Sequence, residues 1–218
     1  VVAAAAQEYV VNHPHPGYAE QDPENWWQAV ADAIHLVMKD QNPDSVKGIG
    51  LDGQMHGLVC LDRDHNPVHP AIIWADTRSR IEVEELGDFR YLSAATLPGP
   101  PAAGFAAASA FWLSRHKPAV LDQTHVILFP KDYLRLRLTG LEGTDPSDAA
   151  ATWLFDIEST AWAPDIASFC GLEFNQLPQI RPSAKVFGEL TERSAKELGL
   201  NAGIPIVTGC ADLPAQAL

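Results

Sequence analysis

The sequence is poor in the residues that mark several common classes of protein. It has only three cysteines and two methionines in 218 residues, and no Cys-x-x-Cys pair is present. Such usage argues against a disulfide framework and predicts reduced thiols in a cytoplasmic protein. Basic residues are also scarce, with 15 Lys and Arg against 28 Asp and Glu, for a formal charge of −13. This balance disfavours nucleic acid and anionic membranes as partners, because Lys and Arg are the residues that hold phosphate groups.

Long apolar runs are missing as well. No stretch reaches the roughly 18 apolar residues needed to span a bilayer. Residues 1–11 show neither the charged region nor the apolar region of a signal peptide. The histidines follow neither His-Glu-x-x-His nor a Cys/His pairing, so the sequence predicts no metal site. We therefore expect a cytoplasmic protein without membrane contact.

Short apolar runs of strand type are present instead. Residues 1–11 alternate like a strand, and further strands are expected at 46–51, 57–61 and 71–74. The last two lie on either side of a turn and predict a hairpin. The apolar run at 204–211 predicts a buried strand that opens into a glycine turn.

Helical periodicity separates these strands. Asp22 followed by Pro23 predicts a helix start, with a capping aspartate and proline at the first position. The apolar stripe that follows, including Trp26 and Trp27, is typical of an amphipathic helix that packs on a core. Further helices are expected at 78–86, 106–116, 130–138 and 191–198. Helices among short strands predict an α/β domain with a mixed sheet flanked by helices. The length suits one large domain or one and a half.

One motif is misleading. Residues 48–53 spell Gly-x-Gly-x-x-Gly, which in a dinucleotide site follows a strand and opens a helix. Here the apolar strand pattern runs through the glycines and continues after them. We therefore reject dinucleotide binding.

Polar residues at the ends of strand-like runs predict a functional site. Asp212 lies at the exit of an apolar run, His56 lies between glycines, and Trp74 and Asp76 end another run. Together they suggest a base and a small polar ligand. Each residue also has a purely structural interpretation: a helix cap for Asp212 and Asp76, and a place in the core for His56 and Trp74.

Five motifs, taken in order, resemble one known family. They are Gly-Gln-Met-His-Gly at 53–57, a run ending Trp-Ala-Asp-Thr-Arg at 70–78, a run beginning Phe-Pro-Lys-Asp-Tyr at 129–140, Asp-Pro-Ser-Asp-Ala-Ala at 145–150 and Gly-Cys-Ala-Asp at 209–212. In order and spacing they resemble the N-terminal domain of the FGGY carbohydrate kinases. The first motif is typical of the xylulokinase-like branch, and the resemblance covers nearly the whole chain.

The resemblance implies a fold and a reaction. It implies an actin-like ATPase, or ribonuclease H-like, domain with a mixed β-sheet flanked by helices. Residues 1–218 would be an N-terminal sugar-binding domain, without the family's first hairpin and its C-terminal ATP-binding domain. The implied activity is ATP-dependent phosphorylation of a pentulose, with D-xylulose favoured. ATP and Mg²⁺ would be bound mainly by the parts outside this chain, and the resemblance leaves a homodimer open.

The resemblance also implies roles for single residues. Asp212 matches the general base that takes the proton from the attacking sugar hydroxyl. Met55 and His56 match the pair that contacts the sugar, Met55 through its apolar side chain and His56 through hydroxyl groups. Trp74 and Asp76 match the neighbouring wall of the sugar pocket.

Two departures from the family pattern qualify these roles. Leu213 stands where the family commonly has an amide residue, and the segment before Ser109 lacks the Pro-Lys pair often found there. Two alternatives to xylulose phosphorylation therefore stay open: a kinase of the same family that acts on another ketose or polyol, and a catalytically inactive sugar-binding module. Other acidic residues at turns and helix starts are expected to be structural: Asp132, Asp145 and Asp148.

Overall fold

The computed structural model describes residues 1–217, which form a mixed α/β domain as predicted. The helices are α1 (Pro23–Met38), α2 (Arg80–Phe89), α3 (Ala106–His116), α4 (Pro118–Gln123), α5 (Pro130–Thr139), α6 (Pro146–Ala151), α7 (Pro164–Phe169), α8 (Glu192–Leu198) and α9 (Asp212–Gln216). The strands are β1 (Glu20–Gln21), β2 (Asp52–Gly53), β3 (Val59–Leu61), β4 (Ala71–Ile72), β5 (Val126–Leu128), β6 (Phe155–Asp156), β7 (Ala161–Trp162), β8 (Val186–Glu189), β9 (Pro205–Val207) and β10 (Cys210–Ala211).

The strands form short pairs that single bridges join. Strand β3 pairs antiparallel with β5, and β4 pairs antiparallel with β1. A bridge between Leu58 and Ile72 links these two pairs. Strand β10 pairs in parallel with β2, and a parallel bridge from Ile49 to Ile206 brings β9 alongside the same segment. Parallel and antiparallel pairing therefore occur together, as a mixed sheet requires.

The predicted helices with strong end signals are confirmed. Helix α1 begins at Pro23, and the Asp22 side chain caps it by accepting a hydrogen bond from the Glu24 N–H at 2.9 Å. Helix α3 has the predicted bounds, and it is buried on most sides, as a helix that is apolar nearly all round must be. The hairpin is confirmed too, since Leu58 and Ile72 exchange backbone hydrogen bonds at 2.8 and 3.1 Å.

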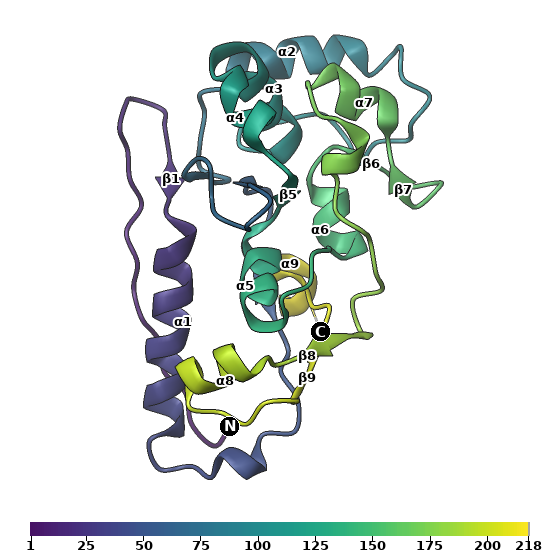
Figure 1. Ribbon diagram of the computed structural model, residues 1–218. Helices are drawn as coiled ribbons and strands as arrows, with labels where there is room; N and C mark the ends of the chain where they lie inside the picture. Colours follow the sequence, from purple (N-terminus) through teal and green to yellow (C-terminus); the bar gives the residue numbers. More distant parts are fainter. Residues whose placement is uncertain (218) are drawn as a thin grey trace.

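Three predicted strands need correction. Residues 1–11 form no strand in the described chain; they are exposed and extend alongside α1 (Figure 1). Residues 46–51 contribute only the bridge at Ile49, because pairing begins at β2. Residues 204–211 form two strands, not one, because Gly209 adopts a φ of +83° that breaks the ladder between β9 and β10.

The buried apolar residues form three clusters, and two of them lie at opposite ends of the molecule. Figure 1 shows α2, α3, α4 and α7 gathered at one end, and α8 with the β8–β9 pair at the other, with α5 and α9 between them. A large apolar cluster around Phe111 and Trp153 fills the first end. A second cluster, which joins Trp27, Leu198 and Ile206, fills the other. A third cluster joins Trp26, Val59 and Tyr133.

The cysteines are free thiols, and Cys60 and Cys170 are buried. Burial raises the pKa of Cys60 to about 12, so this thiol is unreactive at neutral pH. In residues 1–217 we find no helix with the length and apolar character needed to cross a membrane.

Candidate active site

Two parallel strands deliver polar residues to one place. Strand β10 lies beside β2 with Cys210 opposite Asp52 and Ala211 opposite Gly53. Parallel neighbours end at the same edge of a sheet, so Asp212 and Gln54 leave their strands side by side. A hollow of about 440 Å³ opens there, and its lining includes Asp212, Asp52, Gln54 and Lys131 but not Met55, His56, Trp74 or Asp76. The pairing of β2 with β10 therefore brings Asp212 next to the Gln54 to His56 loop, 156 to 158 residues earlier in the chain.

Asp212 is half-buried and is the first residue of α9. Its Oδ1 accepts a hydrogen bond from the Leu213 N–H at 2.9 Å. The capping position itself belongs to Ala211, which has extended backbone angles, so the carboxylate is not the helix cap. Within the described residues Oδ2 has no hydrogen bond. This oxygen can therefore accept a hydrogen bond from a ligand hydroxyl, or its proton.

His56 is held in one orientation by three features. Its φ is +70°, a left-handed conformation that is uncommon for residues other than glycine and is often found at functional sites. Its ring stacks on Phe105, with centroids 4.1 Å apart and planes 5° from parallel. Its Nδ1 lies 2.6 Å from the Ala151 carbonyl oxygen. Because a carbonyl only accepts, Nδ1 carries the proton, and Nε2 of the neutral ring is an acceptor.

The charge of His56 is set by its surroundings. Burial lowers the pKa of His56, against the opposing effects of the Ala151 carbonyl and the Asp212 carboxylate. The ring is therefore neutral at neutral pH and can accept a hydrogen bond from a ligand hydroxyl. Because the charge of Asp212 affects the pKa of His56, the two side chains interact electrostatically.

The Trp74 to Asp76 loop closes against the start of α3. A Cβ at Gly104 would lie 2.3 Å from the Trp74 carbonyl oxygen, and Gly104 has a φ of +83°, so only glycine fits this approach. Because Phe105 follows Gly104, the contact links the loop to the residue that stacks on His56. Trp74 is 59% exposed, which leaves its face free for a ligand, and Met55 beside His56 is half-buried.

Asp76 is engaged inside the protein. It is 1% exposed, and its Oδ2 accepts hydrogen bonds from the Ala19 N–H at 2.6 Å and from Arg78 Nη2 at 2.7 Å. Its Oδ1 accepts from the Arg78 N–H at 2.9 Å. These contacts make Asp76 the residue that holds the Trp74 loop, and direct contact between Asp76 and a sugar stays a prediction.

A buried charged cluster lies behind the site. Lys131 Nζ is 2.5 Å from Asp132 Oδ1, 3.3 Å from Asp145 Oδ1 and 3.2 Å from Asp148 Oδ2. Arg135 Nη1 donates to Asp132 Oδ1 at 2.7 Å. Burial by itself lowers the pKa of Lys131, but the three carboxylates outweigh it and raise that pKa, so the ammonium stays charged. The three acidic residues take part in the packed structure, as expected from the sequence.

Asp148 is the one acid in this cluster that favours its neutral form. Neither of its oxygens has a hydrogen bond with good geometry in the described chain. Burial, reinforced by the Asp132 charge, raises the pKa of Asp148 to about 8 although Lys131 opposes the shift. At pH 7 a protonated Asp148 leaves the charges of Asp132 and Asp145 balanced by those of Lys131 and Arg135.

The raised pKa of Asp148 predicts a pH effect on stability. Its stabilising contribution is complete below the ordinary pKa of about 3.8 and is lost as the pH rises to about 8. The Asn side chain of Asp148→Asn cannot titrate. The free energy of unfolding of this variant, relative to that of the wild type, should therefore increase as the pH rises from 4 to 8, by at most about 1.4 kcal/mol per pH unit. Urea unfolding at several pH values measures this difference, and a difference independent of pH would contradict the prediction.

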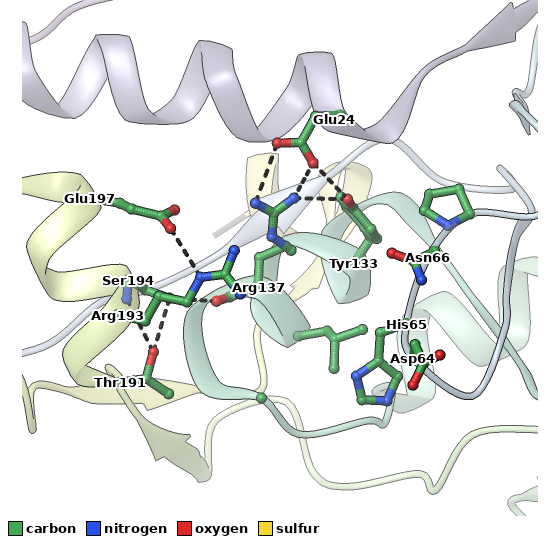
Figure 2. A pocket seen from close by; sticks show the side chains of 13 residues that line it. Glu24, Asp64, His65, Asn66, Tyr133, Arg137, Thr191, Arg193, Ser194 and Glu197 are labelled. Atoms are coloured by element: carbon green, nitrogen blue, oxygen red, sulfur yellow. Dashed lines mark hydrogen bonds and ion pairs between the residues drawn. The ribbon is translucent and has the colours of Figure 1, made fainter.

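Another hollow, of about 480 Å³, is lined in part by α5, and most of its charged side chains are already paired. Figure 2 shows two of these pairings: Arg137 with Glu24 and Tyr133, and Arg193 with Glu197, whereas Asp64 has no partner among the residues drawn. We therefore place the functional site at Asp212 and not here.

Sequence reasoning missed three residues near the site. Phe105, which stacks on His56, follows the glycine of a segment noted only for a missing Pro-Lys pair. Lys131 lies in a motif used only for the family resemblance. Ser147 lies within the Asp-Pro-Ser-Asp motif, whose first residue caps helix α6. An aspartate followed by proline, as at Asp145, is a sequence signal for the start of a helix. It does not show which distant residues the side chains of that turn contact.

Comparison with known proteins identifies the family to which this fold belongs. The sequence model described as the FGGY family of carbohydrate kinases, N-terminal domain, matches residues 1–218, so the chain belongs to this family. It is 37% identical over 219 residues to a xylulose kinase from Escherichia coli K12, covering 100% of this chain and 45% of that protein.

Two solved structures extend the comparison. The crystal structure of xylulose kinase from Rhodospirillum rubrum superimposes with a TM-score of 0.93 at 28% identity, covering 100% of this chain and 46% of the other. A gluconate kinase from Lactobacillus acidophilus gives 0.85 at 25% identity, covering 94% and 42%. The chain thus spans about half the length of the relatives it matches.

Proposed function

We propose that this chain is the sugar-binding domain of a kinase that phosphorylates a pentulose with ATP, D-xylulose being the favoured substrate. One observation carries the proposal: the parallel pairing of β2 and β10 brings Asp212, with a free carboxylate oxygen, next to the loop that holds Met55 and His56. The similarity to xylulose kinases supports the choice of substrate.

The proposed reaction needs one base in the site. Asp212 takes the proton as the sugar O–H bond breaks, the sugar oxygen forms a bond to the γ-phosphorus of ATP, and the bond from that phosphorus to the β,γ-bridging oxygen breaks to release ADP. Phosphoryl transfer depends mainly on positioning and charge stabilisation, so an oriented carboxylate is a sufficient base.

The other site residues are proposed to bind the sugar. His56 Nε2 accepts a hydrogen bond from a hydroxyl group, since Nδ1 is committed to Ala151. Met55 packs on the carbon skeleton, and Trp74 offers an exposed aromatic face to C–H groups. A few polar groups on an apolar wall are typical of sites for small ligands.

The magnesium of the reaction is not assigned to this chain. Among residues 1–217 no group of three or more His, Cys, Asp or Glu side chains is arranged to hold a metal ion. We propose that ATP and Mg²⁺ are held mainly by other parts of the kinase. A homodimer and a cytoplasmic location stay predictions.

His56→Ala tests the sugar contact. The substitution removes the acceptor and leaves buried polar partners unsatisfied, so affinity for xylulose should fall by about 1–3 kcal/mol, or roughly 5- to 150-fold in the KM. The KM is measured in a coupled ADP assay on the protein expressed from its complete reading frame. His65→Ala is the control, because His65 has a similar φ of +63° but lies in the β3–β4 turn. An unchanged KM for His56→Ala would remove this residue from the site.

A different sugar is the second candidate. The structural similarity to a gluconate kinase shows that this fold also occurs in a protein named for another substrate. A panel of ketoses, polyols and gluconate in the same assay separates the candidates. The highest kcat/KM for a sugar other than xylulose would replace the substrate but keep the kinase, whereas no turnover with any of them would favour an inactive sugar-binding module.

A further inference from the structure

The backbone directly before Asp212 is held by a side chain from another helix. The buried Ala211 N–H donates a hydrogen bond to Ser147 Oγ at 2.9 Å. Ser147 lies in the first turn of α6, 64 residues earlier in the chain. Since Ala211 adjoins Asp212, this bond sets where the carboxylate leaves β10.

The hydroxyl of Ser147 is itself oriented by a buried carboxylate. Ser147 Oγ donates to Asp145 Oδ2 at 2.6 Å, and the other oxygen of Asp145 lies 3.3 Å from Lys131 Nζ. Burial raises the pKa of Asp145, but Lys131 and the two serine hydroxyls outweigh it and hold the pKa below its ordinary value. Asp145 is therefore an ionised acceptor, which commits the Ser147 proton to it and leaves the oxygen lone pairs for the Ala211 N–H.

The same strand is anchored at its other end. Arg135 Nη1 donates to the Thr208 carbonyl at 2.7 Å. At Gly209 a Cβ would lie 2.4 Å from the Leu51 carbonyl oxygen, so this turn packs directly on the segment before β2. The Ser147 bond acts on the residue adjacent to Asp212, which also pairs with Gly53 of β2, whereas the anchors at Thr208 and Gly209 are three or four residues away.

We propose that Ser147, oriented by Asp145 and Lys131, is a positioning residue that holds Asp212 in reach of the sugar hydroxyl. The inference rests on the proposed role of Asp212 as the base. A displacement of about 1 Å in a catalytic group can lower a rate on the order of 100-fold, and β10 is only two residues long, so few other bonds hold it.

Ser183 provides a matched control. Its hydroxyl donates to the same Asp145 Oδ2 at 2.7 Å, but among the described residues its side chain makes no hydrogen bond with Ala211. Ser183→Ala therefore removes an equal bond from Asp145 and leaves the bond to Ala211 in place. Ser147→Thr keeps the hydroxyl and should restore what Ser147→Ala loses.

The experiment compares kcat and KM of these variants in the protein expressed from its complete reading frame. Ser147→Ala should lower kcat about 10- to 100-fold with the KM for xylulose nearly unchanged. Ser147→Thr and Ser183→Ala should keep kcat within about threefold of wild type. In an Asp212→Asn background, Ser147→Ala should have little further effect, because a residue acting through Asp212 has nothing left to position.

The outcomes separate this inference from the proposed function. If Asp212→Asn lowers kcat but Ser147→Ala behaves like Ser183→Ala, the positioning role is overturned and the kinase assignment stands. If Asp212→Asn keeps its kcat, the role of Asp212 itself is wrong. If Ser147→Ala does not fold, the exchange rate of the Ala211 amide hydrogen is measured in the wild-type protein instead. We expect this amide to be protected, and exchange as fast as in an unfolded peptide would overturn the proposal.

Discussion

Asp212→Asn is expected to lower turnover by roughly 10²- to 10⁴-fold while sugar binding survives. The amide keeps the shape of the side chain and one acceptor oxygen, but it has no basicity, and general-base catalysis contributes about that factor. The Oδ1 contact with the Leu213 N–H can persist in the variant, so the helix start should be kept. The kcat is measured in a coupled ADP assay, and sugar binding by calorimetry.

Asp52→Asn is the control for this variant. Asp52 lies opposite Cys210 in the paired strands and lines the same hollow, so its substitution removes one negative charge from the site without touching the proposed base. It should leave kcat within a few fold. An equal loss in both variants would assign the effect to the charge of the hollow. If Asp212→Asn costs only about 1 kcal/mol of stability and keeps wild-type turnover, the aspartate has a structural role alone.

Lys131→Met is expected to produce the largest loss of stability. Its side chain is fully buried, and its ammonium lies within 3.3 Å of three carboxylates. Removing one partner from a buried ionic cluster leaves charge that water cannot reach, which typically costs about 3–5 kcal/mol. Methionine is long and apolar enough to occupy the space of the stem, so the loss reports on charge and not on a cavity.

Urea unfolding of the 218-residue chain measures this loss. Lys196→Met in α8 makes the same chemical change at an exposed position and should alter the free energy of unfolding by no more than about 0.5 kcal/mol. A loss below about 1 kcal/mol for Lys131→Met would mean that the carboxylates become protonated together and tolerate the absence of the cation.

The helices were predictable because their signals are local. The Asp22-Pro23 pair with its apolar stripe specifies α1, and the apolar run that begins at Ala106 specifies α3, without reference to the rest of the chain. Strands depend on partners instead. Residues 1–11 have the alternation of a strand but pair with nothing in the described chain, whereas β2 needs only two residues because β10 lies beside it.

The candidate site also combines features that the sequence predicts with contacts that it does not predict. The motif at 53–57 and the position of Asp212 after an apolar run identified a base and a polar loop from the sequence. The stacking of Phe105 on His56 and the bond from Ala211 to Ser147 could not be read from it. These contacts join residues 49 and 64 positions apart, and no periodicity or spacing records which distant side chains meet.

The amino-acid sequence alone determined the chemistry available to this protein: an acidic chain, capped helices, short apolar strands and a family resemblance that singled out Asp212, Met55, His56 and Trp74. Only the tertiary structure decided how that chemistry is held. It turned Asp76 inward to Ala19 and Arg78, and buried Lys131 among three acids. The physical reason is that capping and periodicity act within a few residues of the chain, whereas burial and ion pairing depend on which segments the fold packs together.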